Sequence, residues 1–416
     1  MESGGKYLLL VVILLSFLLS FPAYGMKPAW NITNNGEYIS DIAITDDGSR
    51  LITGTMTGIA TVYDQNGTII WERQVPGSLV VGCEENGNAF IIGSQEDIYS
   101  NKGAVRSFDR NGSQQWMVNT GCVAALGLAR ENKCIVVGNR RGDLIVLDGL
   151  GNEVAKFNDF PQTDVVSGIS VSDNGKIFTY ALYEMYPQVR YISINTQEKG
   201  YLRGLYNGSK TGYGGGEQIT ALALSSDGNY LITSNGEGSQ GTLCLYGNGR
   251  IIWSKDTGEI SDIAILANGS AVYAGKTNGE ILGYSRSGDL LFSLFSGSAI
   301  TSLSLATDEN LLAAGTANGN LYLLNDTGSL LWTSRIEEFP VAEISRVEIS
   351  RNGASLVVLV NNKHLYYFVN EPETVPVTRT PTPVSESSPA SPEESSLSVA
   401  LIVCGLLAVF VLARRQ

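Results

Sequence analysis

Four short apolar runs separated by tight turns occupy residues 39–71. The segment reads ISDIAITDDGSRLITGTMTGIATVYDQNGTIIW, with Asp47-Gly48 between the first two runs and Asn66-Gly67 between the last two. Asx-Gly pairs supply the positive φ angles of short hairpins, and runs of this length rich in β-branched residues are typical of strands. The pattern predicts a four-stranded antiparallel sheet. Residues 260–265 repeat ISDIAI letter for letter, which indicates an internal repeat.

The repeat can be counted from its first and fourth runs. First runs begin near Ile39, Leu79, Val123, Val166, Ile219, Ile260, Ile300 and Ile344. The large apolar residue of the fourth run falls at Trp30, Trp71, Trp116, Phe157, Leu202, Trp253, Phe292 and Trp332. A period near 40 residues without helical periodicity is typical of the four-stranded blades of a propeller.

The two ends of the repeat region complement each other. The last unit, residues 341–369, has three runs and no fourth, whereas residues 27–32 form a fourth run without a sheet of its own. Pairing the two closes a ring and leaves no exposed edge at the seam. The sequence therefore predicts an all-β fold over residues 26–370: an eight-bladed β-propeller, with seven blades as the alternative, closed by an N-terminal strand.

The segments that flank the repeats predict an exported, membrane-anchored chain. Residues 1–25 resemble a signal peptide, with a basic residue, an apolar run and small residues before Met26. Residues 371–396 are rich in Pro, Ser, Thr and Glu, as in an extended stalk. Residues 397–413 carry no charge and predict a single transmembrane helix, followed by a short tail, residues 414–416, with two arginines. The expected location is the cell membrane, with the propeller outside.

The net charge and the reactive side chains limit which classes of partner and site we expect. The formal net charge of −13 disfavours nucleic acid as a partner. The five cysteines are scattered without a CxxC pair, although a Cys122–Cys134 disulfide is conceivable, and His364 is the only histidine. Equivalent inner-strand positions hold Asp41, Asp262 and Arg346 among mostly small residues, and Asp41 is expected to pair with Arg346 across the closure. We predict no metal site.

Four segments resemble one known repeat. They are VYDQNGTIIW (62–71), SFDRNGSQQW (107–116), LYGNGRIIW (245–253) and LLNDTGSLLW (323–332), and each is similar to the strand–turn–Trp motif of the quinoprotein (PQQ-like) propeller repeat and, more loosely, of WD40-like repeats. The resemblance covers residues 27–369 and implies a propeller. For cofactor-bearing quinoproteins it also implies a central calcium ion and an adjacent cysteine pair. This chain has no adjacent cysteines, so we predict no cofactor.

Loops longer than a propeller requires indicate where a partner could bind. Extended connections are expected at residues 94–102, 158–164, 183–189 and 203–217, all in blades 2 to 5 and on one face. Tyrosine offers a large contact area at low entropic cost, and the candidate binding residues are Tyr183, Tyr186, Tyr206 and Tyr213. The alternative is a degenerate fourth blade whose insertion covers a gap.

Six sequons mark candidate glycosylation sites, although Asn-Gly-Ser/Thr is also ordinary turn chemistry. They are Asn31, Asn66, Asn111, Asn207, Asn268 and Asn325. Four of them fall on tight turns of the face from which the predicted stalk leaves. We expect that face to look toward the membrane and the tyrosine loops to look outward.

The sequence favours a non-enzymatic module that binds an extracellular protein or carbohydrate. It has no nucleophile elbow and no Gly-rich phosphate loop. A structural envelope component is the alternative. A quinoprotein-like oxidoreductase and a carboxylate-only glycosidase or lyase are the remaining enzyme hypotheses.

Overall fold

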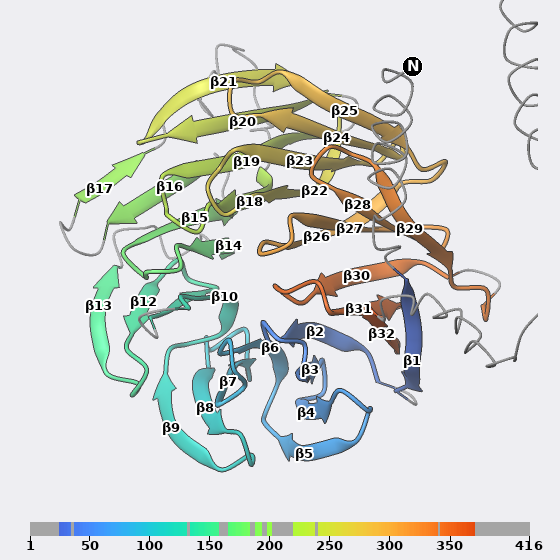
Figure 1. Ribbon diagram of the computed structural model, residues 1–416. Coiled ribbons are helices and arrows are strands. Elements are labelled where there is room, and N and C mark those ends of the chain that lie inside the picture. Colours follow the sequence, from blue (N-terminus) through green and yellow to red (C-terminus); the bar gives the residue numbers. More distant parts are fainter. Residues whose placement is uncertain are drawn as a thin grey trace, which may run out of the picture. The chain divides into compact units, whose positions relative to one another are not determined.

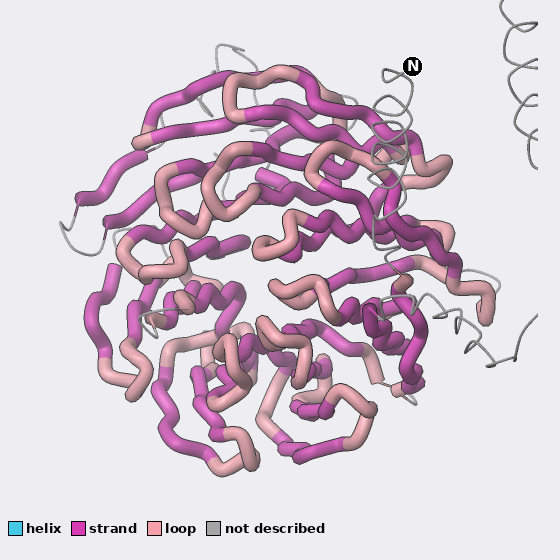
Figure 2. The backbone as a smooth tube through the Cα atoms, in the orientation of Figure 1, coloured by secondary structure: helices cyan, strands magenta, loops and turns pink. Residues whose placement is uncertain are grey.

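The computed structural model describes residues 25–370, apart from 35–36, 131–133, 158–164, 184–187, 194–197, 202–218, 238–239 and 340–341. The chain divides into two units, residues 1–373 and 374–416, and every described residue lies in the first. The described residues form strands and loops (Figure 2), and none of them forms a helix long and apolar enough to cross a membrane. The predicted signal peptide, stalk and transmembrane helix lie outside the described residues.

Eight four-stranded antiparallel sheets make up this unit, one for each predicted repeat. Their strands, blade by blade from the innermost outward, are β2 (Ile39–Ile44), β3 (Arg50–Thr55), β4 (Ile59–Asp64) and β5 (Ile69–Gln74); β6 (Ser78–Cys83), β7 (Ala89–Gln95), β8 (Ala104–Asp109) and β9 (Gln114–Asn119); β10 (Val123–Leu128), β11 (Ile135–Asn139), β12 (Leu144–Leu147) and β13 (Glu153–Phe157); β14 (Val165–Val171), β15 (Ile177–Tyr183), β16 (Gln188–Ser193) and β17 (Glu198–Tyr201); β18 (Ile219–Leu224), β19 (Tyr230–Glu237), β20 (Gln240–Gly247) and β21 (Arg250–Asp256); β22 (Ile260–Ile265), β23 (Ala271–Lys276), β24 (Glu280–Ser285) and β25 (Leu290–Phe295); β26 (Ile300–Ala306), β27 (Leu311–Thr316), β28 (Asn320–Asn325) and β29 (Leu330–Arg335); β30 (Ile344–Ile349), β31 (Ser355–Val360), β32 (His364–Asn370) and β1 (Met26–Thr33).

The sheets stand side by side in a ring around a central axis (Figure 1). The region between the eight first strands, along this axis, is here called the channel. Each first strand contacts the first strand of the next blade, and β30 of blade 8 contacts β2 of blade 1. The N-terminal strand β1 pairs antiparallel with β32, from Met26 opposite Asn370 to Thr33 opposite His364. The predicted fold and its closure by the N-terminal strand are confirmed.

Antiparallel alternation gives the propeller two distinct faces. The turns between first and second strands and between third and fourth strands share one face, here called the turn face. The connections between second and third strands and from blade to blade share the other, here called the loop face. β32 is the third strand of blade 8, so the described chain ends at Asn370 on the turn face, where its N–H donates to the Ala354 carbonyl at 2.8 Å.

The apolar core lies between adjacent blades. Between blades 1 and 2, for example, Val62 and Trp71 pack with Leu79 and Phe90, all buried. Fourth-strand tryptophans reach the next blade as well: Trp30 Nε1 donates to the Gln65 carbonyl at 2.9 Å, and its ring lies against Gly67, where a Cβ atom would fall 2.9 Å from the indole. β1 therefore completes blade 8 by pairing with β32, and its Trp30 side chain also packs against blade 1.

Two predicted fourth-strand anchors are wrong. Trp71 lies opposite Val62, and the equivalent residue of blade 3 is Ala155 opposite Val146, not Phe157. In blade 4 the equivalent residue is Gly200 opposite Tyr191, not Leu202. Blades 3 and 4 thus lack the large side chain that ties most blades to their neighbours. Phe157 is buried and contacts Phe178 of blade 4 with ring centroids 6.2 Å apart.

Candidate binding face

The connection between β7 and β8 is the longest second-to-third-strand loop whose residues are all described. It runs from 96 to 103, whereas the equivalent connections of blades 1, 6 and 7 have three residues each, for example 277–279. A short Gly-centred turn suffices to join these strands, so the extra residues are not needed by the sheet. The loop lies on the loop face and overlaps residues 94–102, one of the four extended segments expected from the sequence.

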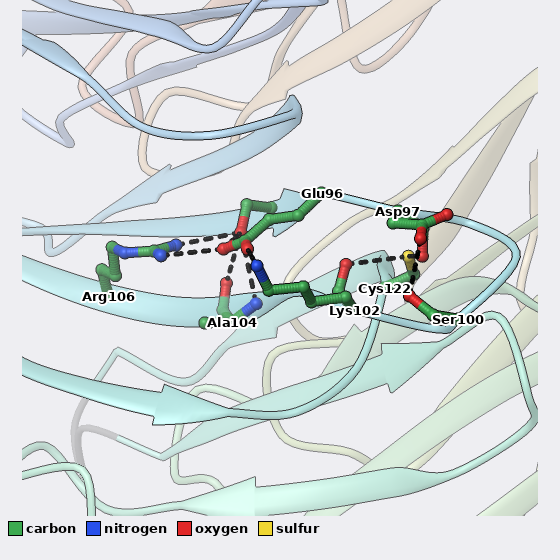
Figure 3. Close-up of polar contacts among 8 residues, drawn as sticks. Glu96, Asp97, Ser100, Lys102, Ala104, Arg106 and Cys122 are labelled. Carbon is green, nitrogen blue, oxygen red and sulfur yellow. Dashed lines mark hydrogen bonds and ion pairs between the residues drawn. The ribbon is translucent and has the colours of Figure 1, made fainter.

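A buried ion pair supports one side of this loop (Figure 3). Arg106 Nη2 lies 2.9 Å from Glu96 Oε1, and the two side chains are only 9% and 10% exposed. Arg106 Nη1 also donates to Ser94 Oγ at 2.9 Å, and Lys102 Nζ lies 3.3 Å from Glu96 Oε2. The hydrogen bond from Arg106 holds the pKa of Glu96 below its usual value, so the carboxylate stays charged.

A second set of contacts supports the other side. The Cys122 thiol, from blade 3, donates to the carbonyls of Asp97 and Lys102 at 3.1 and 3.2 Å, and its N–H donates to Asn101 Oδ1 at 2.9 Å. Asp97 accepts a hydrogen bond from the Ser100 hydroxyl at 2.7 Å (Figure 3). It also accepts one from the Tyr99 N–H at 3.0 Å. The Ser100 hydroxyl is the main cause that lowers the pKa of Asp97. Polar contacts therefore fix the loop at both ends of its turn.

The side chains at the tip of this loop are apolar and exposed. Ile98 is 52% exposed and Tyr99 is 90% exposed. Two more large side chains are exposed on the neighbouring part of the loop face, Met56 in the β3–β4 connection and Tyr38 just before β2. Met56 N donates to the Tyr38 carbonyl at 3.0 Å, and Lys363 Nζ lies 4.4 Å from the centre of the Tyr38 ring.

Backbone contacts link the bases of these two loops on adjacent blades. Gly58, beside Met56, accepts a hydrogen bond from Val75 N at 2.7 Å. A Cβ on Gly77 would lie 2.1 Å from the Gln95 carbonyl, at the base of the β7–β8 loop. We call Tyr38, Met56, Ile98 and Tyr99 the apolar loop surface. It spans blades 1 and 2.

The sequence-predicted tyrosines are mostly outside the described residues. Tyr183 is the last residue of β15, and Tyr186, Tyr206 and Tyr213 fall in undescribed segments. Sequence reasoning missed Tyr99, although it had selected the loop that carries it. The available signal was an Ile-Tyr pair between Asp97 and Ser100, at the centre of a loop too long for its hairpin.

Four sequons lie on turns of the turn face. Asn66, Asn111 and Asn268 are exposed, and Asn325 is half-buried, with its Oδ1 accepting the N–H groups of Thr327 and Ser329 at 3.1 and 2.8 Å. Asn31 is exposed on β1, and Asn207 lies outside the described residues. Their use as glycosylation sites stays a prediction.

The channel carboxylates join consecutive blades. Asp41 Oδ2 accepts the Val81 N–H at 2.9 Å, and Asp262 Oδ2 accepts the Leu303 N–H at 2.8 Å. Asp41 also pairs with Arg346, as the sequence predicts. Burial raises the pKa of Asp262 to about 6, and burial also raises the pKa of Asp41, because it outweighs the nearby arginine.

The carboxylates of Asp41 and Asp262 do not fit as ligands for the calcium ion and quinone of cofactor-bearing propellers. The carboxylate oxygens already accept backbone N–H groups, and a calcium ion needs six or more oxygens. No three His, Cys, Asp or Glu side chains are grouped to hold a metal within the part of the chain that the structure describes.

Charged side chains meet across the channel at its turn-face end. Arg351 of blade 8 lies 3.2 Å from Asp173 of blade 4, across the ring, and 2.6 Å from Asp308 of blade 7. Arg130 of blade 3 contacts Asp173 at 3.5 Å and also Asp46 of blade 1. We call these five residues the mouth network. It ties blade 1 to blade 3 and blade 4 to blade 8, which are not neighbours in the ring.

Comparisons with known proteins agree with this architecture. Residues 207–403 match the family model described as outer membrane protein assembly factor BamB, slightly less than half of the chain. No curated protein matches. Among solved structures, the C-terminal WD40 domain of Sif2 is similar at TM-score 0.66 and 14% identity, over 85% of this chain and 100% of that one.

Two further structures show the same likeness. The computationally designed Ika8 protein has TM-score 0.64 and 18% identity, over 83% of this chain and 100% of its own. The Dos1 propeller has TM-score 0.63 and 13% identity, over 83% and 95%. At these identities the structures report on fold alone. They confirm that this chain is a β-propeller, and the family-model match shows that its repeats are similar to PQQ-like repeats.

Proposed function

We propose that this chain is a non-enzymatic binding module, exported and membrane-anchored, that recognises an extracellular protein through the apolar loop surface. The observation that carries the proposal is the β7–β8 loop, in which a buried ion pair and a thiol hold an exposed Ile98-Tyr99 pair in place. A loop that served only to connect two strands would need neither the extra residues nor the buried charges.

Rigid presentation favours binding. A loop already fixed in one conformation loses little entropy on association, so contact energy is retained as affinity. Aromatic side chains in the centre of an interface contribute most of the binding energy in many complexes. Ile98 and Met56 are aliphatic and offer nothing that a sugar hydroxyl could bond, so a protein partner is favoured over a carbohydrate.

Site-specific photocrosslinking tests the proposal. The photoreactive residue p-benzoylphenylalanine replaces Tyr99 in the full-length chain, and crosslinked species are identified by mass spectrometry on intact cells. The matched control carries the same residue in place of Leu150, which is 77% exposed on the β12–β13 turn of the opposite face. A discrete protein adduct at position 99 and not at 150 is the expected result.

Other outcomes would contradict specific parts of the proposal. A carbohydrate adduct at position 99 would keep the face and replace the partner class. Equal adducts at positions 99 and 150 would favour a structural envelope component, which has neighbours on all sides. The absence of any adduct at position 99 would rule out this loop as the recognition site.

A further inference from the structure

The outermost strand of blade 6, β25, presents an apolar edge at the perimeter of the ring (Figure 1). β24 is its neighbour within the sheet, and no strand of the described chain pairs with its other edge. Its sequence is LLFSLF, in which Leu290, Leu291 and Phe295 are 57%, 46% and 70% exposed. No other outer strand with described side chains exposes three large apolar residues. Such an edge is a template for pairing with another strand.

The other outer strands carry polar groups that protect an edge. Charged side chains and proline are the usual protection. β25 has neither, whereas β9 exposes Gln114, Gln115 and Asn119. The remaining six outer strands contain charged residues, which are Lys27 in β1, Glu72 and Arg73 in β5, Glu153 and Lys156 in β13, Glu198 and Lys199 in β17, Arg250, Lys255 and Asp256 in β21, and Arg335 in β29. The apolar edge is therefore specific to blade 6 and is not a property of the repeat.

The side chains of β25 divide between the two sides of the strand. Phe292 and Leu294 are partly buried and pack in the core shared by blades 6 and 7. Leu291, Ser293 and Phe295 alternate with them and are exposed. Packing on one side therefore holds the strand extended, and its free edge and its other side remain available.

We propose that this edge binds a second copy of the chain, through antiparallel pairing of β25 with β25 about a two-fold axis. Such an axis places one residue opposite its own copy and pairs the residues around it symmetrically. With Ser293 at the centre, Leu291 lies opposite Phe295 of the second copy on the exposed side. On the other side, Phe292 lies opposite Leu294 of the second copy. Each of these large side chains then meets another, so the strand is complementary to itself.

The absence of charge on β25 favours a second copy over a different partner. Two identical strands bring identical side chains close together, and opposed like charges destabilise a strand pair. β25 has no charge to oppose, and a second copy always supplies an apolar strand of matching pattern. The net charge of −13 repels the second copy at long range, so the pair should tighten as salt rises. Blade 6 does not carry the apolar loop surface, so this proposal is independent of the recognition proposed above.

Disulfide trapping on the full-length chain, purified in mild detergent, tests the register. Directly opposed residues of an antiparallel pair have Cα atoms about 4.5–5.5 Å apart, within reach of a disulfide. Ser293→Cys should therefore form a covalent dimer above the background of the unsubstituted chain on a non-reducing gel. The matched control is Thr333→Cys, at the equivalent exposed position of β29, which should add nothing to that background. Differently tagged Leu291→Cys and Phe295→Cys chains should crosslink to each other and not to themselves.

A charge on the edge tests whether β25 drives association. Leu291→Lys should raise the dimer dissociation constant, measured by sedimentation, at least about tenfold, because the charge would lie against an apolar side chain. Leu330→Lys on β29 is the matched control, because Leu330 is 48% exposed, and it should leave the constant unchanged. Both side chains are already half in water, so neither change should unfold the chain.

Four results would overturn the proposal. They are a chain that stays monomeric, equal crosslinking of Ser293→Cys and Thr333→Cys, crosslinking of Leu291→Cys to itself, and a dimer that Leu291→Lys leaves unchanged. The last result would place the interface on another surface.

Discussion

The two faces of this propeller are ends of the same thirty-two strands, yet they place their charged groups differently. On the turn face, Arg351 and Asp308 are 26% and 52% exposed, and the mouth network lies at the open end of the channel. On the loop face, Arg106 and Glu96 are almost completely buried beneath the β7–β8 loop. On the turn face, partly exposed ion pairs join different blades. On the loop face, a buried ion pair within blade 2 fixes the conformation of one loop.

Because the two sets of ion pairs differ in exposure, they contribute to the structure in different ways. Exposed pairs are screened by salt and contribute little each, so a network across the channel stabilises the ring mainly through its number of contacts. A buried pair contributes little net free energy when intact, but removing one partner leaves an unpaired charge buried in the protein interior, which is strongly destabilising. Such a pair specifies one loop conformation. Three substitutions and one pH profile test the contrast, ordered by expected effect.

Replacement of Arg106 with methionine should have the largest effect on stability. Glu96 would lose its buried charged partner and keep the Ser94 hydroxyl and Lys102, whose side chain is 72% exposed. We expect a loss of about 3–5 kcal/mol in the free energy of unfolding, measured by denaturant titration, with little dependence on salt. Lys102→Met is the matched control, and it should cost less than about 1 kcal/mol. Equal losses for both variants would show that burial of the pair has no special role.

The channel between the two faces should give the protein a pH-dependent stability. The pKa of Asp262 is about 6 in the folded protein, above its ordinary value, because the group is buried. The folded state therefore holds the proton more tightly than the unfolded state. This contribution to stability is complete below about pH 4 and is lost as pH rises through 6, with an expected change of about 3 kcal/mol.

The variant Asp262→Asn isolates that contribution. An asparagine keeps an oxygen to accept the Leu303 N–H and removes the titration. The difference in unfolding free energy between the natural chain and the variant should change between pH 4 and 7 and stay constant above it. A difference that is flat over this range would mean that Asp262 keeps an ordinary pKa.

Breaking the mouth network should have a smaller and salt-dependent effect. Arg351→Gln leaves Asp173 with Arg130 and leaves the half-exposed Asp308 in contact with water. We expect a loss of about 1 kcal/mol at low salt that shrinks when ionic strength rises to about 1 M, because these groups are partly exposed. A loss that persists undiminished in high salt would place this network in the same class as the Arg106–Glu96 pair.

Features that recur in every blade could be predicted from the sequence. The register of individual fourth strands and the contacts across the ring could not. Strand starts, the eight-blade count and the pairing of Asp41 with Arg346 follow from aligning equivalent positions. Ala155 and Gly200 could not be placed, because a shift of one or two residues in a short fourth strand changes which side chain faces the next blade. The mouth network joins turns from opposite sides of the ring, so no local pattern indicates it.

The candidate site shows the same limit. Loop length identified the β7–β8 segment, but tyrosine content directed attention to the loops of blade 4 and its connection to blade 5. Whether Tyr99 is exposed depends on Asp97, Asn101 and Cys122, which fold the loop back on itself. That information lies in contacts between blades 2 and 3 and is not visible in composition.

The smallest effect on stability should come from the residues that matter most for recognition. The paired substitution Ile98→Ser and Tyr99→Ser removes apolar side chains that are already largely in water, so the free energy of unfolding should change by less than about 0.5 kcal/mol. Affinity for a partner identified by crosslinking at position 99 should fall at least about tenfold, since exposed anchors are buried only in the complex. The corresponding change on the turn face, Leu150→Ser, should alter neither quantity. If the double variant instead destabilised the fold as Arg106→Met does, the loop tip would belong to the structure of the blade, and the two faces would differ in their ion pairs but not in their function.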